Sequence, residues 1–234
     1  MTRTRWIIFA VICLGILGTL IVMANRDKVN VSDIDDTKIV NSGVIKDHVF
    51  GTRAAKATLI EYGDFQCPGC GSLYPILRPL KEHYKNQLTF IFRNYPLTSI
   101  HPNALAAATA AEAAGLQGKF FEMHNKLYET QSAWQGASPT ERVNIFKQYA
   151  VEVGVDSKQF AKDLNSKDVA DKIRRDQALA GKAKATGTPT LLLNNEKIEN
   201  TTWNDSVKFE KKIREIIEES GQELPAPMNK EIKA

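Results

Sequence analysis

Hydrophobic and polar residues follow periods that change several times along this chain. Near the N-terminus, an uncharged apolar run extends from Trp6 to Ala24. Further on, the short apolar stretch ATLIEYGDF at 57–65 predicts a buried strand. Apolar residues then recur at helical spacing from Leu73 to Tyr84, and LTFIFRNYPL at 88–97 is rich in the aromatic and β-branched residues of a second strand. This pattern predicts strand, helix and strand in succession.

The next part of the chain has a different character. Between residues 99 and 185 the sequence predicts helices throughout, beginning with an alanine-rich stretch at 103–114. A strand period returns at TPTLLLNNEKI, where Asn194-Asn195 has the composition of a hairpin turn. A last amphipathic helix follows, with Asp205 as its expected N-cap.

The order of these elements predicts an α/β fold in which a βαβ half and a ββα half are joined by a helical insertion. We expect four regions: an N-terminal segment at 1–24, a linker at 25–45, one folded domain at 46–221 and a flexible tail at 222–234. The linker is predicted because charged residues there mix with single aliphatic residues without a sustained period.

Composition and charge exclude few classes of protein. The 234 residues are 43% hydrophobic and 25% charged, which is ordinary for a globular protein with a sizeable core. The net charge of +4 is small, and most Lys and Arg residues alternate with Asp and Glu along predicted helices. We therefore expect no nucleic acid as a partner.

The apolar run at the N-terminus has two interpretations. Because it exceeds the length of about 18 residues that a membrane-crossing helix needs, it predicts a single transmembrane signal-anchor. The alternative is a cleaved signal peptide, since Val22-Met23-Ala24 resembles a small-residue cleavage site. The run is longer than a usual signal core, which favours the anchor. In both interpretations the rest of the chain is exported.

The cysteines restrict the chemistry. The chain has only Cys13, inside the apolar run, and the pair Cys67 and Cys70 in GDFQCPGC. A structural zinc site usually needs four Cys or His ligands, and the four histidines are too dispersed to supply the rest. A disulfide across so short a loop adds little stability. We therefore expect no metal, and we interpret the pair as a redox reagent.

The predicted position of the pair supports this interpretation. Unpaired backbone N–H groups and the helix dipole at a helix N-terminus stabilise an anion, so the thiolate of Cys67 is favoured. Cys67 is then the attacking sulfur, and Cys70 resolves the mixed disulfide by closing the loop. Pro68 suits the first helical turn, where a missing N–H has no cost.

A second motif makes the assignment specific. ATGTPT at 185–190 places Thr188-Pro189 just before a strand. With this motif and FQCPGC, the sequence resembles the DsbA-like thiol oxidoreductases of the thioredoxin superfamily, including membrane-tethered bacterial members. The resemblance covers residues 46 to about 220. It implies a thioredoxin fold, a mixed sheet flanked by helices, with an inserted helical subdomain at about 100–185.

The resemblance also implies roles for individual residues. Pro189 corresponds to the family's cis-proline, and with Thr188 it shapes the groove that docks a substrate peptide. Glu61, six residues before Cys67, stands where these proteins carry a carboxylate beneath the motif. A desolvated glutamate there would have a raised pKa and could relay a proton to or from Cys70. Alternatively, Glu61 faces solvent or a salt-bridge partner.

Three further residues belong to this picture. Gly69 stands where the best-known DsbA motif has a histidine that stabilises the thiolate, so the oxidising strength is open. Asp64 is expected to cap or hydrogen-bond the motif loop, and His101 to be a surface residue before a helix. Neither is expected to act in the chemistry.

The sequence therefore predicts a membrane-tethered, extracytoplasmic enzyme that introduces disulfides into exported polypeptides with free thiols. We expect a monomer without a cofactor, reoxidised by a membrane redox partner. If the N-terminal segment is cleaved, the protein is secreted or periplasmic instead. Two alternatives stay open: a disulfide reductase or isomerase on the same fold, and a redox-inert binding module.

Overall fold

The computed structural model describes residues 3–26 and 29–228. The chain forms two compact units, residues 1–30 and 31–234. The first contains helix α1 (Arg3–Arg26), whose described apolar side chains from Trp6 to Leu20 are exposed. Among the residues that the structure describes, no helix has both the length and the apolar character needed to cross a membrane.

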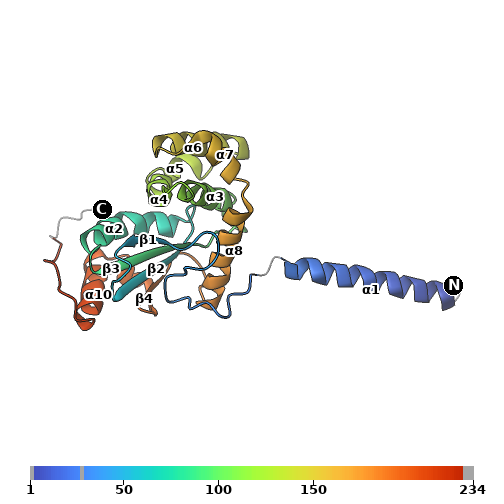
Figure 1. Ribbon diagram of the computed structural model, residues 1–234, viewed down its shortest axis with the longest axis horizontal. Helices are drawn as coiled ribbons and strands as arrows, with labels where there is room; N and C mark the ends of the chain where they lie inside the picture. Colours follow the sequence, from blue (N-terminus) through green and yellow to red (C-terminus); the bar gives the residue numbers. More distant parts are fainter. Residues whose placement is uncertain (1–2, 27–28, 229–234) are drawn as a thin grey trace. The chain divides into compact units, whose positions relative to one another are not determined.

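A five-stranded mixed sheet forms the centre of the second unit, as Figure 1 shows. Its strands are β1 (His48–Gly51), β2 (Ala57–Gly63), β3 (Leu88–Asn94), β4 (Thr190–Leu193) and β5 (Glu196–Ile198). Their order across the sheet is β1-β3-β2-β4-β5, and only β2 and β3 run parallel. Strand β1 was not predicted, because its four residues are too few to establish an alternating pattern.

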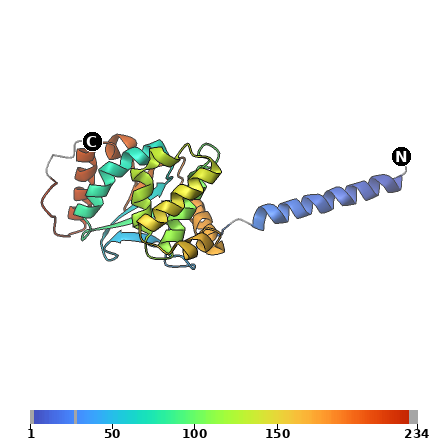
Figure 2. The ribbon, with the colours of Figure 1, turned by 90° about the horizontal axis from the view of Figure 1, so that it is seen from above.

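Helices cover both faces of the sheet. On one face lie α2 (Pro68–His83) and α10 (Ser206–Glu219), which pack side by side (Figure 2). On the other face, α8 (Lys167–Lys182) contributes Leu179 to a cluster with Ile60 and Tyr62 of β2. Because side chains alternate along a strand, Leu59 and Glu61 of β2 point to the α2 face. The alternation thus places a carboxyl group beneath the start of α2.

The predicted helical insertion is present between β3 and β4. Besides α8 it contains α3 (Ala104–Gly115), α4 (Phe120–Glu129), α5 (Gln131–Trp134), α6 (Pro139–Glu152) and α7 (Ser157–Asp163). Figure 1 shows α3 and α4 between the α2 layer and the outer helices. Alanines of α3 are buried in the same core as Leu73 of α2 and Phe90 of β3. Small side chains allow this close approach, so the insertion is part of one core.

Capping and turn residues define the ends of helices and strands where the sequence predicts them. Ser138 and Glu141 form a reciprocal capping box at the start of α6, and the Asp205 side chain accepts hydrogen bonds from two backbone N–H groups of α10. Asn194 and Asn195 both have positive φ angles, 45° and 75°, which fits a two-residue hairpin turn between β4 and β5. A short helix, α9 (Asn200–Trp203), precedes α10.

The folded unit begins earlier than predicted, at Val31 instead of residue 46. Residues 29–45 have no helix or strand, yet Val40 and Ile45 are buried and backbone carbonyls of Lys38 and Ile45 accept hydrogen bonds from arginine side chains of the domain. Single aliphatic residues at irregular spacing therefore pack this segment against the domain. Because their spacing has no helix or strand period, the sequence pattern did not predict this packing.

The predicted tail is also attached over its described part. Residues 222–228 have no regular secondary structure, but Arg214 donates to the Pro225 carbonyl and the Met228 N–H donates to Glu210. The remaining residues, 229–234, lie outside the described part of the chain.

A buried group of charges joins the insertion to the sheet. The ammonium of Lys172 on α8 lies 2.5 Å from Asp176, 3.7 Å from Asp47 and 3.8 Å from Glu112, and all four side chains are fully buried. Arg93 of β3 pairs with Asp47 at 2.8 Å. Because unpaired charges are costly in the interior, each carboxylate here depends on its cations.

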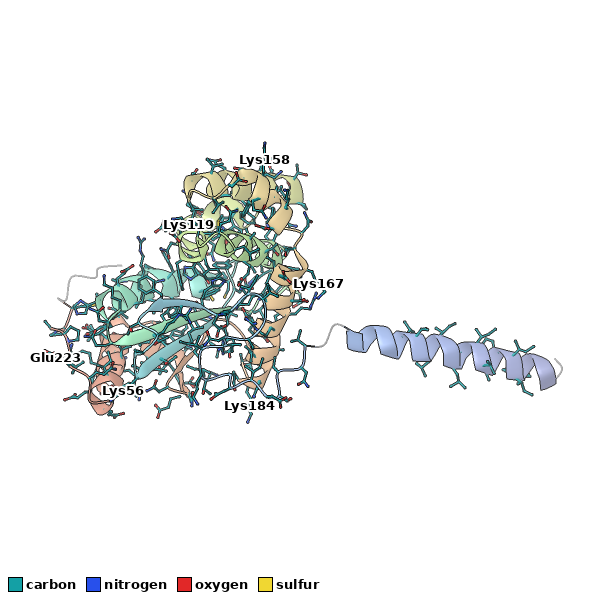
Figure 3. All side chains as sticks on the ribbon, in the orientation of Figure 1. Lys56, Lys119, Lys158, Lys167, Lys184 and Glu223 are labelled. Carbon is teal, nitrogen blue, oxygen red and sulfur yellow. The ribbon has the colours of Figure 1, made fainter. Side chains whose placement is uncertain are left out.

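Replacing Lys172 with methionine should lower the free energy of unfolding by about 3–5 kcal/mol, because buried carboxylates lose their cation. Urea denaturation of the reduced protein measures this. The matched control is Lys167→Met, which removes an i,i+4 partner of Asp171 from the exposed face of the same helix (Figure 3) and should cost less than about 1 kcal/mol. If both variants lower the free energy of unfolding by the same amount, the buried charges around Lys172 stabilise the protein no more than an exposed ion pair does.

Candidate active site

The end of β2 and the start of α2 place Cys67 at a helix N-terminus. The strand ends at Gly63, and the helix begins at Pro68, so Cys67 is the N-cap residue. The Cys70 thiol donates a hydrogen bond to the Cys67 sulfur, the backbone N–H groups of Gly69 and Cys70 point to it, and together these lower its pKa to about 5 against the burial that opposes them. At neutral pH Cys67 is a thiolate without any histidine in the motif.

The second sulfur has the opposite character. Cys70 lies inside α2 and is 1% exposed. Burial raises the pKa of Cys70 well above its ordinary value, and the nearby Cys67 and Glu61 raise it further. Cys67, at 7% exposed, is itself largely buried, so the pair consists of a slightly more exposed sulfur that forms a thiolate and a fully buried thiol that keeps its proton.

The loop before β4 lies against the pair. The Thr188-Pro189 peptide bond is cis, as the resemblance implies, and the Cys67 sulfur lies 3.2 Å from the Thr188 carbonyl oxygen, to which it donates a hydrogen bond only in its protonated form. A Cβ atom on Gly69 would approach Pro189 Cδ to 3.2 Å. The glycine thus lets the two loops meet closely, and a side chain at position 69 would require Pro189 to shift by a few tenths of an ångström.

Glu61 lies beneath the motif, buried on the α2 face of β2. It is 2% exposed, so the alternative that it faces solvent is wrong. Burial raises the pKa of Glu61 to about 8, although Lys81 opposes the shift. The carboxyl group is therefore protonated at neutral pH and can exchange a proton in the range where the thiols react.

Lys81 is a functional candidate that the sequence analysis missed. Its ammonium is buried within 4.9–5.1 Å of the ring centroids of Phe50, Phe90 and Phe121. Burial lowers the pKa of Lys81 to about 8, and Glu61 opposes the shift. The signal was available, because Lys81 lies four residues after Leu77 on the apolar face of α2. A lysine on the apolar face of a helix is unusual, because lysine is rarely buried without a partner, and it therefore indicates a polar or charged group nearby in the core.

Asp64 and His101 fix the loop that leads to Cys67. Asp64 accepts hydrogen bonds from the backbone N–H groups of Gln66 and Leu97, as expected of a residue that orders the motif loop. His101 Nδ1 lies 2.7 Å from the Asp64 carboxylate, and its side chain is 15% exposed. His101 is therefore a partner of Asp64 and not the surface residue that we expected.

The insertion reaches the motif through an amide side chain. Gln131, the first residue of α5, donates to the carbonyl oxygens of Phe65 and Cys67 at 2.7 and 3.0 Å. Gln66 in turn donates to the Gln135 carbonyl and accepts from the Asn103 N–H. These contacts hold the motif loop against α5. Sequence patterns could not indicate them, because the partners lie 37 to 69 residues apart.

The chemistry of the site is that of its two sulfurs. Within residues 3–26 and 29–228, no cluster of three or more His, Cys, Asp or Glu side chains is arranged to hold a metal ion. A thiolate at a helix N-terminus, a buried partner thiol and a protonated carboxyl group can carry out thiol–disulfide exchange.

A family model described as Thioredoxin matches residues 44–212. This chain belongs to the thioredoxin family. Among solved structures, the thioredoxin-family chain is similar to a thioredoxin-like oxidoreductase from Silicibacter pomeroyi, with a TM-score of 0.55 and 26% identity over 71% of this chain and 92% of that one. It also shares its fold with BdbD from Bacillus subtilis, with a TM-score of 0.64 and 23% identity over 77% and 99% of the two chains. Its cis-proline loop has the form that the resemblance to DsbA-like thiol–disulfide oxidoreductases implies.

Curated relatives of this thioredoxin-family chain carry other names. The protein named Na(+)/H(+) antiporter NhaA 1 of Salinispora arenicola is 38% identical over 152 residues, and that of Mycolicibacterium gilvum 36% over 154. These matches cover 65% of this chain but only 22% and 24% of those proteins. Most of each relative has no counterpart here, so the antiporter activity in its name is not transferred to this chain.

We predict that iodoacetamide alkylates Cys67 of the reduced protein rapidly at pH 6–7, with a rate that rises around pH 5. Cys70 should react slowly, because it is buried and protonated. Mass spectrometry of the alkylated peptides measures both. Cys67→Ser is the control and should abolish the fast phase. Faster labelling of Cys70 would reverse the assigned characters of the two sulfurs.

We predict that Glu61→Gln removes part of the pH dependence of stability. The folded pKa of Glu61, about 8, exceeds its ordinary value of 4.5. The folded state therefore binds this proton more tightly, and its stabilisation is lost as pH rises towards 8. The free energy of unfolding of reduced Glu61→Gln, minus that of the wild type, should accordingly increase from pH 5 to pH 8.

Urea denaturation at several pH values measures this difference. Glu199→Gln, at an exposed position, is the matched control and should follow the wild-type profile. A difference that stays constant between pH 5 and pH 8 would show that Glu61 is already ionised in the folded protein.

Proposed function

We propose that this enzyme introduces disulfide bonds into exported polypeptides. The observation that supports the direction is the pKa of Cys67, which its surroundings lower to about 5. A stabilised thiolate favours the reduced form of the enzyme, so its disulfide is a stronger oxidant. The same thiolate is also a good leaving group when a mixed disulfide is resolved by a second substrate thiol.

The proposed reaction begins with the enzyme in its disulfide form. A substrate thiolate attacks Cys67, which is the more accessible sulfur, and forms a mixed disulfide while Cys70 leaves. A second thiolate of the substrate then attacks the substrate sulfur of the mixed disulfide and releases Cys67 as a thiolate. The substrate gains a disulfide, and the enzyme gains two electrons. Reoxidation needs a separate disulfide or quinone-linked partner, which we propose lies at the membrane.

Two further roles complete this proposal. Thr188 and Pro189 form an edge beside Cys67, where an extended substrate segment can pair with the backbone. Glu61 holds a proton near neutral pH and supplies it to Cys70 when that sulfur leaves. Lys81 stands close enough to Glu61 to influence its charge, and so assists the transfer.

We also propose that the catalytic domain is extracytoplasmic, monomeric and attached to the membrane through its N-terminal segment. The support comes from the sequence, in which Trp6 to Ala24 carries no charge. In addition, stable disulfides form in oxidising compartments outside the cytoplasm, where such an enzyme has substrates.

The direction can be tested with the equilibrium between the protein and glutathione. We expect the Cys67–Cys70 couple to have a reduction potential less negative than about −180 mV. We also expect the enzyme in its disulfide form, added in stoichiometric amount, to oxidise a reduced, unfolded ribonuclease rapidly. Cys67→Ser should be inactive in both assays. A potential below about −250 mV, together with efficient reduction of insulin, would instead establish the reductase alternative.

A further inference from the structure

Tyr128 of α4 is a buried phenol with no assigned role. Its side chain lies in the core and its hydroxyl oxygen has no hydrogen-bond partner of regular geometry. An unpaired hydroxyl in the interior costs free energy, and phenylalanine would fill the same space without that cost. The hydroxyl therefore calls for an explanation from its surroundings.

The surroundings place this hydroxyl at the redox pair. Burial raises the pKa of Tyr128, and the neighbouring Cys70, Glu61 and Asp64 raise it further, with Cys70 close enough to share a hydrogen bond. Cys70 is itself 1% exposed. Water is therefore largely kept from the sulfur. Tyr128 and Cys70 lie in the same core cluster, and the Tyr128 ring stacks on Tyr74, which follows Cys70 by one turn of α2, so the phenol lies beside the redox pair.

The ring of Tyr128 is held in place by other aromatic rings. It stacks on Tyr74 with a centroid distance of 5.4 Å, and lies 5.0 Å from both Phe65 and His124. With its ring enclosed on several sides, the hydroxyl has little freedom to find another partner. Such a fixed donor needs little reorganisation when charge develops beside it.

We propose that the Tyr128 hydroxyl donates a hydrogen bond to the Cys70 sulfur when that sulfur carries negative charge during thiol–disulfide exchange. This proposal rests on the exchange chemistry proposed above and adds a residue of the insertion to it. The hydroxyl is unpaired in the resting reduced protein because the Cys70 thiol keeps its own proton. Its hydrogen bond forms as the Cys67–Cys70 bond breaks.

The electron balance identifies when the charge appears. As the substrate thiolate attacks Cys67, a new bond forms between the substrate sulfur and the Cys67 sulfur. The Cys67–Cys70 bond breaks, and its electron pair leaves on Cys70. Tyr128 stabilises this pair without giving up its proton, and Cys70 finally takes the proton held by Glu61. In the reverse step, Cys70 attacks Cys67 through the same transition state.

A group that acts only in a shared transition state changes rates but not the equilibrium. Tyr128→Phe should therefore slow both the reduction of the enzyme disulfide by glutathione and its reformation by oxidised glutathione, each by about tenfold, as expected for a hydrogen bond to a charged group. The equilibrium constant with glutathione should stay within about twofold of the wild-type value, since both rates fall together. Stopped-flow tryptophan fluorescence and quenched alkylation measure these quantities.

Tyr74→Phe is the matched control. This ring stacks on Tyr128, but its hydroxyl bonds to Glu129 at 2.9 Å, away from the sulfurs. The control should leave both exchange rates within about twofold of the wild type, since no hydroxyl near Cys70 is lost. Tyr128→Phe should unfold at the same urea concentration as the wild type or a higher one, because it removes an unpaired buried hydroxyl.

Three results would overturn the proposal. These are unchanged rates in Tyr128→Phe, equal slowing in Tyr74→Phe, and an equilibrium constant that shifts by as much as the rates, which would indicate a structural role. A failure of the proposed function is recognised separately, because the wild type itself would then exchange slowly with glutathione or have a reducing potential.

Discussion

The start of helix α2 at Pro68 is the constraint on which the chemistry depends. Because the helix begins there, the first sulfur lies outside it and the second lies inside, one turn later. The backbone N–H groups without helical partners face Cys67, while Cys70 is enclosed by the core. A single structural boundary thus gives two identical side chains opposite protonation states. No histidine in the motif is needed to stabilise the thiolate, which explains how Gly69 can occupy that position.

The polar groups beneath the motif would be costly in an ordinary core. Glu61 and Lys81 are both nearly excluded from water, and burial moves both pKa values to about 8. The three phenylalanine rings around Lys81 partly replace its hydration by cation–π contacts. A site with an acid and a base whose pKa values lie close to each other and to the working pH moves protons readily. The cost in stability is therefore connected to the chemistry of the sulfurs.

The helical insertion contributes to the site as well as covering it. Gln131 donates a hydrogen bond to the carbonyl of Cys67, and Tyr128 lies in the same core cluster as Cys70. Both side chains hold their positions only if the insertion is rigidly attached to the sheet. The buried charges around Lys172 and the alanine surface of α3 provide that attachment. Electrostatic pairing in the interior therefore supports the geometry of a site that lies elsewhere in the molecule.

The sequence by itself determined the elements whose signals are local. Periodicity located the strands at Glu61 and Phe90, turn and cap residues located the hairpin and α6, and the spacing of Cys67 and Cys70 indicated the chemistry. Tertiary structure alone decided which distant groups meet. How separate elements pack determines that Lys81 is buried, that His101 pairs with Asp64 and that Tyr128 lies in the same core cluster as Cys70. Tertiary contacts also stabilise β1 and the segment that begins at Val31, and neither has a periodic sequence pattern that would predict it. Local patterns encode backbone conformation, whereas pKa values and hydrogen-bond partners depend on neighbours that only the fold brings together.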